Sequence, residues 1–294
     1  MKIKKASNRF KEKTKMIMKK IGYKVYFLLR NLMFVSCVFV FMGCNDMFDY
    51  SPYDAVVTGK TNINAENIKK IENKCRNKDT IRVVFCGDTQ GRYDATNDFV
   101  DEINKRKDVD FVVHLGDISD FGTTNEYLYQ RDILERLNCP YVVLLGNHDC
   151  LGTGFHVYKK LFGNPNFSFI AAGIKFVCLN TNAMEFLNTD SVPNLSFMKH
   201  EVVKDTSLYT NTVVCMHIPP HNPEFNNNLD EVFHSYVKSF KGILFCTAAH
   251  EHHLAEKDVF SDGIIYYITD CMRRKQYNLM TITKNNYTYE AIYF

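Results

Sequence analysis

The sequence predicts an α/β fold, built on a largely parallel sheet that is covered on both faces. From residue 80 onward, continuous apolar and β-branched runs alternate with segments of helical length, a pattern typical of βαβ units. Polar residues also follow several of these runs at intervals of about 30 residues, which is the length of one βαβ unit. A chain of 294 residues, 46% of them hydrophobic, can build one large core of this kind.

The first half of the predicted domain alternates strand and helix. Its strand-like runs are rich in Val, Ile and Phe, and its first helical segment places Phe99, Val100 and Ile103 on one face. In chain order the predicted elements are a strand at 80–86, a helix at 94–106, a strand at 110–115, a helix at 123–137 and a strand at 141–145.

The second half is predicted to begin with a hairpin at 167–180 that turns at Ala172-Gly173. Three strand-like segments close the chain, and we expect them to be antiparallel. The other predicted elements are a helix at 195–204, strands at 212–216 and 242–248, and the closing strands at 263–269, 276–283 and 287–294.

Residues 1–43 have the features of a signal peptide. Residues 1–30 carry eleven Lys or Arg and one Glu, whereas residues 31–43 carry no charge, so a basic region precedes an apolar one. The stretch "FMGC" at 41–44 resembles the lipobox of bacterial lipoproteins. This resemblance implies export, cleavage before Cys44 and anchoring through lipidated Cys44 in the bacterial cell envelope, in the periplasm or at the cell surface. An uncleaved membrane anchor is the alternative.

The chain behind this segment is acidic. Of the 36 Lys and Arg residues, 25 follow residue 43, and of the 33 Asp and Glu residues, 32 do. The chain after residue 43 therefore has a formal charge of −7. A basic nucleic-acid-binding face is therefore not expected, nucleic acid is an unlikely partner, and a nuclease ranks low. Residues 44–78 are predicted to form a tether and a short helix, and residues 79–294 the domain.

The ten cysteines show neither CxxC pairs nor zinc-ribbon spacing. Disulfides are possible in an exported protein, but the sequence does not select a pairing. The oligomeric state is equally undetermined by the sequence.

Five polar clusters stand directly behind apolar runs. Their leading residues are Asp88, Asp117, Asn147, His217 and His250, which lie 29, 30, 70 and 33 positions apart. Because the carboxyl ends of parallel strands meet at one edge of a sheet, we expect these clusters to converge there.

The residue types in these clusters indicate a metal site. Carboxylate, amide and imidazole donors without thiolate suit Mn, Fe or Zn, and there are enough of them for two divalent ions that share Asp117. The candidate ligands are Asp88, Gln90, Asp117, Asn147, His217, His250 and His252.

In order along the chain, "GDTQ", "GDISD", "GNHD", "HIPP" and "HEHH" resemble the five motifs of calcineurin-like metallophosphoesterases, over essentially all of 80–270. The resemblance implies two packed mixed β-sheets flanked by helices, an αββα sandwich, over the metallophosphoesterase domain at 79–294. It also implies that Asp88 and His252 bind one ion, that Asn147, His217 and His250 bind the other, and that Asp117 bridges them. His148 would assist the leaving oxygen, and Asp120 would orient His148.

The sequence departs from the family pattern at two positions. Gln90 stands where the family usually has His, and Ala249 stands where it normally has Gly. Gln90 could contact the ion through its oxygen or only through a bound water.

The resulting hypothesis is a hydrolase of phosphate esters, whose nucleophile is a hydroxide that bridges two divalent ions. The substrate would be a phosphorylated small molecule or a phosphodiester, and monoester and diester cleavage stay open because both need the same metal core. His221, Arg273 and Arg274 are candidate substrate-binding residues, with a solvated surface position as the alternative for each. The rival hypothesis is a non-catalytic scaffold of the same fold that binds protein.

Overall fold

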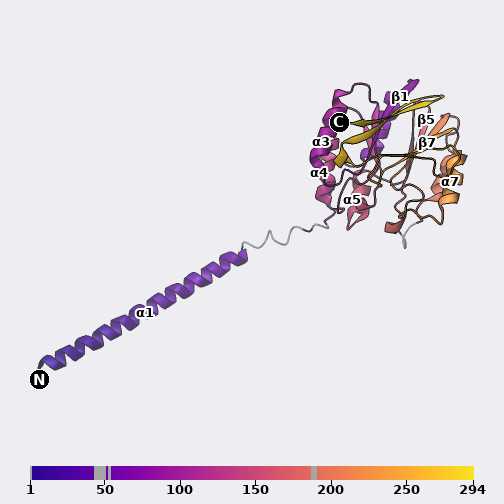
Figure 1. The fold of residues 1–294 in the computed structure, drawn as a ribbon. Coiled ribbons are helices and arrows are strands. Elements are labelled where there is room, and N and C mark those ends of the chain that lie inside the picture. The colour runs from indigo at the N-terminus through magenta and orange to yellow at the C-terminus, as the bar shows by residue number, and fades with distance from the viewer. Residues whose placement is uncertain (1, 43–50, 52–53, 187–190) are drawn as a thin grey trace. The chain divides into compact units, whose positions relative to one another are not determined.

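The computed structural model describes residues 2–42, 51, 54–186 and 191–294 (Figure 1). The chain divides into two compact units, Met1–Ser51 and Pro52–Phe294. The first contains one helix, α1 (Lys2–Met42). None of the described helices combines the length and apolarity that a membrane-spanning segment requires. Cys44 and the predicted cleavage site lie outside the described residues, so the lipoprotein signal peptide stays a prediction.

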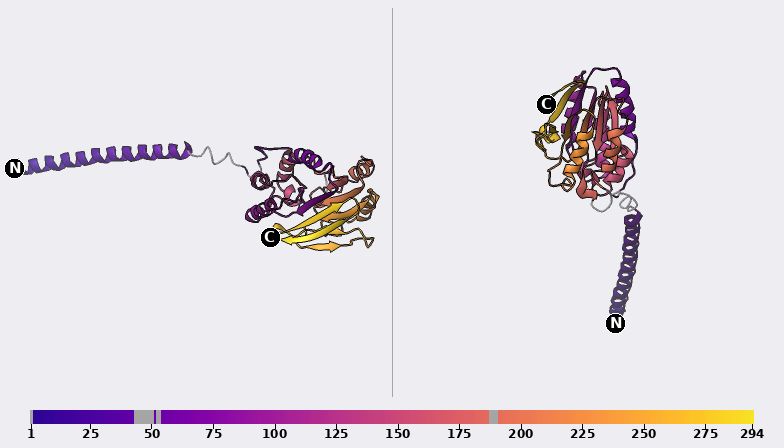
Figure 2. Two further views of the ribbon diagram at one scale, coloured as in Figure 1. Left: turned by 90° about the horizontal axis from the view of Figure 1, so that it is seen from above. Right: turned by 90° about the vertical axis from the view of Figure 1, so that its right-hand side faces the viewer.

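The first sheet of the compact unit Pro52–Phe294 has the strand order β11-β10-β1-β2-β3. Strands β1, β2 and β3 are parallel, and β10 and β11 join them as an antiparallel hairpin, which lies along one edge of the unit (yellow in Figure 2). Their bounds are β1 Thr80–Cys86, β2 Phe111–His114, β3 Tyr141–Val143, β10 Gln276–Thr283 and β11 Tyr287–Tyr293.

The second sheet has the order β4-β5-β6-β7-β9-β8. Strands β5, β6, β7 and β9 are parallel, and β4 and β8 are antiparallel to their neighbours. The expectation that all the closing strands are antiparallel is wrong for β9. Strand β9 runs parallel to β7, because the intervening strand β8 reverses the direction of the chain and pairs with β9 on its other side. The bounds are β4 Phe167–Ala171, β5 Ile174–Leu179, β6 Asn211–Met216, β7 Ile243–Ala248, β8 Ala255–Lys257 and β9 Tyr266–Ile268.

Helices cover the outer face of each sheet. Figure 1 shows α3, α4 and α5 on the side of β1, and α7 on the side of β5 and β7. The predicted αββα sandwich of two mixed sheets is therefore confirmed. The helices are α3 Tyr93–Lys105, α4 Thr124–Leu134, α5 Gly154–Leu161, α6 Leu195–Val203 and α7 Asp230–Ser239.

The layering explains why the strands read as continuous apolar runs. Successive side chains of a strand point to opposite faces. In β1, Val83 and Phe85 pack between the two sheets, whereas Val84 and Cys86 pack under the helices of the first sheet. Both faces are buried, so neither can be polar. The predicted apolar face of α3 lies in the same helix-covered core.

Helix α2 (Ile63–Cys75) belongs to this unit rather than to a tether alone. Asn64 accepts a hydrogen bond from Val143 N at 2.9 Å and donates to Val143 O at 2.8 Å. Asn67 donates to Tyr141 O at 2.9 Å. These two asparagines form hydrogen bonds with backbone groups along the free edge of β3. Without them, these backbone groups would be open to pairing with another strand. The compact unit thus begins before residue 79, where the sequence places the domain boundary.

Each cysteine whose side chain is described is a free thiol. Most of them are buried in apolar surroundings, where cysteine packs as a small hydrophobic residue.

Candidate metal centre

The predicted ligands lie at the carboxyl ends of strands from both sheets. The first sheet supplies Asp88 after β1, Asp117 after β2 and Asn147 after β3, and the second supplies His217 after β6 and His250 after β7. The long interval between Asn147 and His217 is the part of the chain that passes from one sheet to the other. The site therefore joins two sheet edges, where each parallel strand ends in polar residues.

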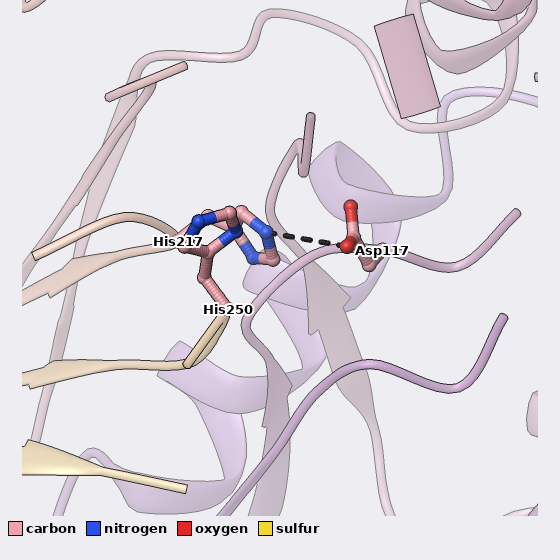
Figure 3. Close-up of side chains that lie close together, drawn as sticks. All are labelled: Asp117, His217 and His250. Atoms are coloured by element: carbon pink, nitrogen blue, oxygen red, sulfur yellow. Dashed lines mark ion pairs between the residues drawn. The ribbon is translucent and has the colours of Figure 1, made fainter. Parts of the chain in front are cut away.

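Four of the candidate ligands converge closely, and we call Asp117, Asn147, His217 and His250 the inner group. Asn147 Oδ1 lies 3.0 Å from His217 Nε2 and 3.1 Å from His250 Nδ1. Asp117 Oδ2 lies 3.4 Å from His217 Nε2, the ion pair drawn in Figure 3. Donor atoms of Asp117, His217 and His250 all lie within 4.8 Å of one another, so one ion could contact them together.

Asp88, Gln90 and His252 form a second cluster, the outer group, which shares Asp117 with the inner group. His252 Nε2 lies 3.5 Å from Asp88 Oδ1, and Gln90 Nε2 donates to Asp117 Oδ2 at 3.3 Å. Donor atoms of Asp88, Asp117 and His252 also lie within 4.8 Å of one another. The outer group is more open, because the His252 side chain is 49% exposed and that of His217 is 0% exposed.

Two buried oxygens of the outer group have no hydrogen-bond partner within the described ranges. They are Asp88 Oδ1 and Gln90 Oε1. A buried oxygen without a partner is destabilising, and a divalent ion would satisfy it. The donors of both groups, which include no thiolate, are those that Mn, Fe or Zn accept. The residues present therefore fit divalent ions, and the Gln90 oxygen is left without a hydrogen bond while the Gln90 nitrogen contacts Asp117.

The backbone of four candidate ligands is held in the left-handed region. The φ angles are 51° at Asp88, 58° at Asp117, 69° at His250 and 52° at His252. Such conformations cost a non-glycine residue about 1–3 kcal/mol and concentrate at functional sites. Hydrogen bonds hold them here, because Asp88 N donates to Gly116 O at 3.0 Å and His250 N donates to Asp88 Oδ2 at 3.1 Å.

Close packing of the backbone explains why position 146 is glycine, and why alanine is tolerated at position 249. A Cβ atom on Gly146 would lie 2.1 Å from Asp117 Oδ1, so no side chain fits there. Gly87 faces Ala249, and a Cβ atom on Gly87 would lie 2.8 Å from the Ala249 methyl group. The methyl group of Ala249 is accommodated because its neighbour across the two sheets is glycine.

A single buried carboxylate, that of Asp149, connects the loops behind β2 and β3. It accepts hydrogen bonds of 2.9 to 3.0 Å from the backbone amides of Asp117, Ile118, Ser119 and Gly146. Removal of this carboxylate would release the loop that carries the shared ligand. Asp149 is a structural brace rather than a group that faces the pocket.

The electrostatics of the inner group centre on one ion pair. Burial lowers the pKa of His217, but the attraction of the Asp117 carboxylate for the imidazolium charge outweighs this effect. The pKa of His217 is therefore raised to about 9. Burial and the charge on His217 lower the pKa of His250. The metal-free site therefore holds a proton on His217, which a metal ion must displace because a ligand imidazole is neutral.

His148 lies beside the ligands, with its ring held from one side. Its Nδ1 atom is 2.8 Å from the Asp120 carbonyl oxygen and 3.5 Å from Asp120 Oδ1. A carbonyl oxygen only accepts, so Nδ1 carries a hydrogen and Nε2 is left for a substrate. Burial opposes the imidazolium charge, but Asp117 and Asp120 raise the pKa of His148. Asp120 thus orients His148 mainly through its main chain.

A pocket of about 350 Å³ opens on the outer group. Its charged and polar lining residues are Asp88, Gln90, Arg92, Asp120, His148, His252 and Arg273. Arg273 was predicted from the sequence, whereas Arg92 was not, because a single arginine at the start of a helix carries no sequence signal. Arg274 and His221 are not among the lining residues. Arg274 Nε lies 3.5 Å from Asp270 Oδ2, and His221 Nε2 lies 3.4 Å from Asp230 Oδ2.

The inner group has a further neighbour that sequence reasoning missed. Glu224 Oε2 lies 3.6 Å from His250 Nε2, on the opposite side of the ring from Asn147. A carboxylate behind a ligand histidine orients the ring and makes it a stronger donor. Glu224 lies in the loop between β6 and α7, where no pattern in the sequence marks it.

Comparisons with known proteins agree with this geometry. A sequence model described as calcineurin-like phosphoesterase matches residues 81–254. No curated protein sequence matches the chain.

Among solved structures, a dimetal phosphatase from Danio rerio matches with a TM-score of 0.56 at 12% identity, over 72% of this chain and 95% of that one. Purple acid phosphatase PPD1 from yellow lupin (Lupinus luteus) matches with a TM-score of 0.54 at 13% identity, over 72% of this chain and 51% of that one. A structure of PhoD matches with a TM-score of 0.51 at 12% identity, over 74% of this chain and 66% of that one. At these identities the likeness concerns the fold.

Proposed function

The chain belongs to the calcineurin-like phosphoesterase family and is a metal-dependent phosphoesterase, and on this premise we propose that it hydrolyses phosphate esters with two divalent ions. The observation that carries the proposal is the convergence of two ligand groups on the shared carboxylate of Asp117. The orphaned oxygens of Asp88 and Gln90 support an ion in the outer group.

The inner ion would be held by Asp117, Asn147, His217 and His250, and the outer ion by Asp88, Gln90, Asp117 and His252. Bound ions would supply Lewis acidity to the phosphoryl group and lower the pKa of water, so that a nucleophile exists at neutral pH. The protein's own contribution is rigidity, since the brace at Asp149 and the bond from Asn147 to both imidazoles fix the donors before an ion arrives.

His148 is proposed to protonate the leaving oxygen. Its Nδ1–H bond to the Asp120 carbonyl fixes the ring and leaves Nε2 on the side of the pocket. General acid assistance of this kind contributes about 10²–10⁴-fold. The contribution grows with the basicity of the leaving group, because a basic alkoxide cannot depart without a proton.

The central experiment is a hydrolysis assay of the purified protein after loading with Mn, Fe or Zn. We expect turnover of p-nitrophenyl phosphate, bis-p-nitrophenyl phosphate or a member of a nucleotide panel, and loss of turnover after chelation. Protein that takes up no transition metal by elemental analysis and hydrolyses nothing in the panel would contradict the proposal and favour the non-catalytic scaffold.

The role of His148 has its own test in His148→Gln. We expect kcat to fall by about 10²-fold or more on an alkyl phosphate, by less on p-nitrophenyl phosphate, and the metal content to stay unchanged. His156→Gln is the matched control, because His156 is an exposed histidine on α5. An equal loss of kcat on both substrates would show that His148 is not the acid.

We propose in addition that the protein is exported and anchored in the cell envelope through lipidated Cys44. The basic residues 1–30, the uncharged residues 31–43 and "FMGC" support this. The full chain should incorporate labelled fatty acid, and Cys44→Ala should abolish the labelling. Cys37→Ala is the control, and unchanged labelling of Cys44→Ala would contradict the proposal.

A further inference from the structure

The pocket over the outer group contains two guanidinium groups that the ligand assignments leave unexplained. Arg92 and Arg273 line the same cavity as Asp88, Gln90 and His252. Arg92 precedes α3, and Arg273 lies in the short helix η4 (Met272–Arg274) behind β9. The two arginines therefore come from chain segments that only the fold brings together.

Both arginines are attached to the loop that carries the outer ligands. Arg92 N donates to Thr89 O at 3.0 Å, and Met272 N, next to Arg273, donates to Asp88 O at 3.2 Å. Any displacement of this loop would move the ligands and both arginines together. The main chain thus places the Cα atoms of both arginines beside the outer group, within reach of the same pocket.

Neither guanidinium has a hydrogen-bond or ion-pair partner among the residues that the structure describes, although the Asp88 and Asp120 carboxylates line the same pocket. Every other arginine of the unit Pro52–Phe294 contacts a polar partner. These six are Arg76, Arg82, Arg106, Arg131, Arg136 and Arg274. Two unpaired guanidinium groups that share one pocket indicate a site for an anion that carries more than one charge.

We propose that Arg92 and Arg273 form a clamp that selects dianionic phosphomonoesters over phosphodiesters, an inference that rests on the proposed phosphoesterase function. A terminal phosphoryl group carries a charge of about −1.5 to −2 at pH 7 and three acceptor oxygens. A diester carries a single charge, and its second substituent replaces one of the oxygens that a guanidinium fork would bind.

The first test compares two substrates in three variants. Arg92→Gln, Arg273→Gln and the double variant are assayed with p-nitrophenyl phosphate and with bis-p-nitrophenyl phosphate, at equal metal content. We expect the wild type to prefer the monoester. We also expect each single change to lower kcat/KM for the monoester by about 10-fold to 100-fold, and that for the diester by less than about 3-fold.

Arg76→Gln is the matched control, since it removes the same charge at the end of α2, just before the amino end of β1. Arg76→Gln should leave kcat/KM unchanged for both the monoester and the diester. A wild type that prefers the diester, or variants that lose both activities equally, would overturn the clamp.

The second test does not depend on turnover. Titration calorimetry of the metal-loaded protein compares inorganic phosphate with dimethyl phosphate. We expect phosphate to bind at least about 10-fold more tightly, and most of this difference to be lost in the double variant. Equal binding of the two anions by the wild type would refute the clamp. If the protein hydrolyses neither ester yet shows a phosphate preference that the double variant loses, the proposed function fails on these substrates and the clamp stands.

Discussion

The inner and outer groups present similar donor atoms in different surroundings. In the inner group Asp117 and His217 are buried, and Asn147 is hydrogen-bonded to both imidazoles. The outer group faces a pocket, contains two buried oxygens that accept no hydrogen bond within the described ranges, and includes a half-exposed histidine. Burial makes the inner group rigid and its charges strongly coupled, since the interior screens charge poorly. The outer group is the one that a substrate can reach.

The largest loss of turnover is expected from Asp117→Asn, because the inner and outer groups both lose the negative charge that they share. Neutralising a bridging ligand removes several kcal/mol of charge stabilisation, so turnover should fall by about 10³-fold or more. Circular dichroism should show an intact fold, because Asn keeps the side chain's shape. Activity close to that of the wild type would defeat the assignment of Asp117 as the shared ligand.

The next contrast is between His217→Gln and His252→Gln. We expect the buried change to weaken metal binding by about 100-fold and the exposed change by about 10-fold, because water can replace a ligand at the open position. Metal content after dialysis against graded chelator concentrations measures both. A larger loss of metal affinity in His252→Gln than in His217→Gln would contradict this prediction.

The pH dependence of metal binding sharpens the comparison further. In the metal-free protein His217 keeps its proton up to its pKa of about 9, and the ion binds only the neutral ring. Affinity of the inner group should therefore rise about tenfold per pH unit between pH 7 and 9 and level off above that range. Calorimetry in buffers of different ionisation enthalpy should detect about one proton released per inner ion, and none of this release in His217→Gln.

The smallest effect is expected from Gln90→His, which installs the residue that the family usually has. An imidazole is a stronger ligand than an amide oxygen, so the outer ion should bind up to about tenfold more tightly. The inner ion should be unaffected. If neither the affinity nor the stoichiometry changes, Gln90 does not contact the ion.

Local features of the sequence predicted much of this fold. Strand β1 occupies the predicted residues 80–86, and the hairpin β4–β5 turns at Ala172-Gly173. Both predictions succeed because strand periodicity and turn chemistry are properties of adjacent residues. Strand β8 was missed, because a segment of three residues with partial burial carries no period. The pairing of β9 was mispredicted for a related reason, since the partner of a strand is not encoded within it.

The sequence by itself determined which residues stand where apolar strands end, and with that the ligand types of both groups, since a buried polar donor needs a partner. Only the tertiary structure decided that Arg92 and Arg273 share a pocket, that Glu224 stands behind His250, and that Ala249 fits against Gly87. The physical reason is distance along the chain: a strand and the polar residues behind it are neighbours in sequence, whereas a pocket is built by segments that meet only when the two sheets pack.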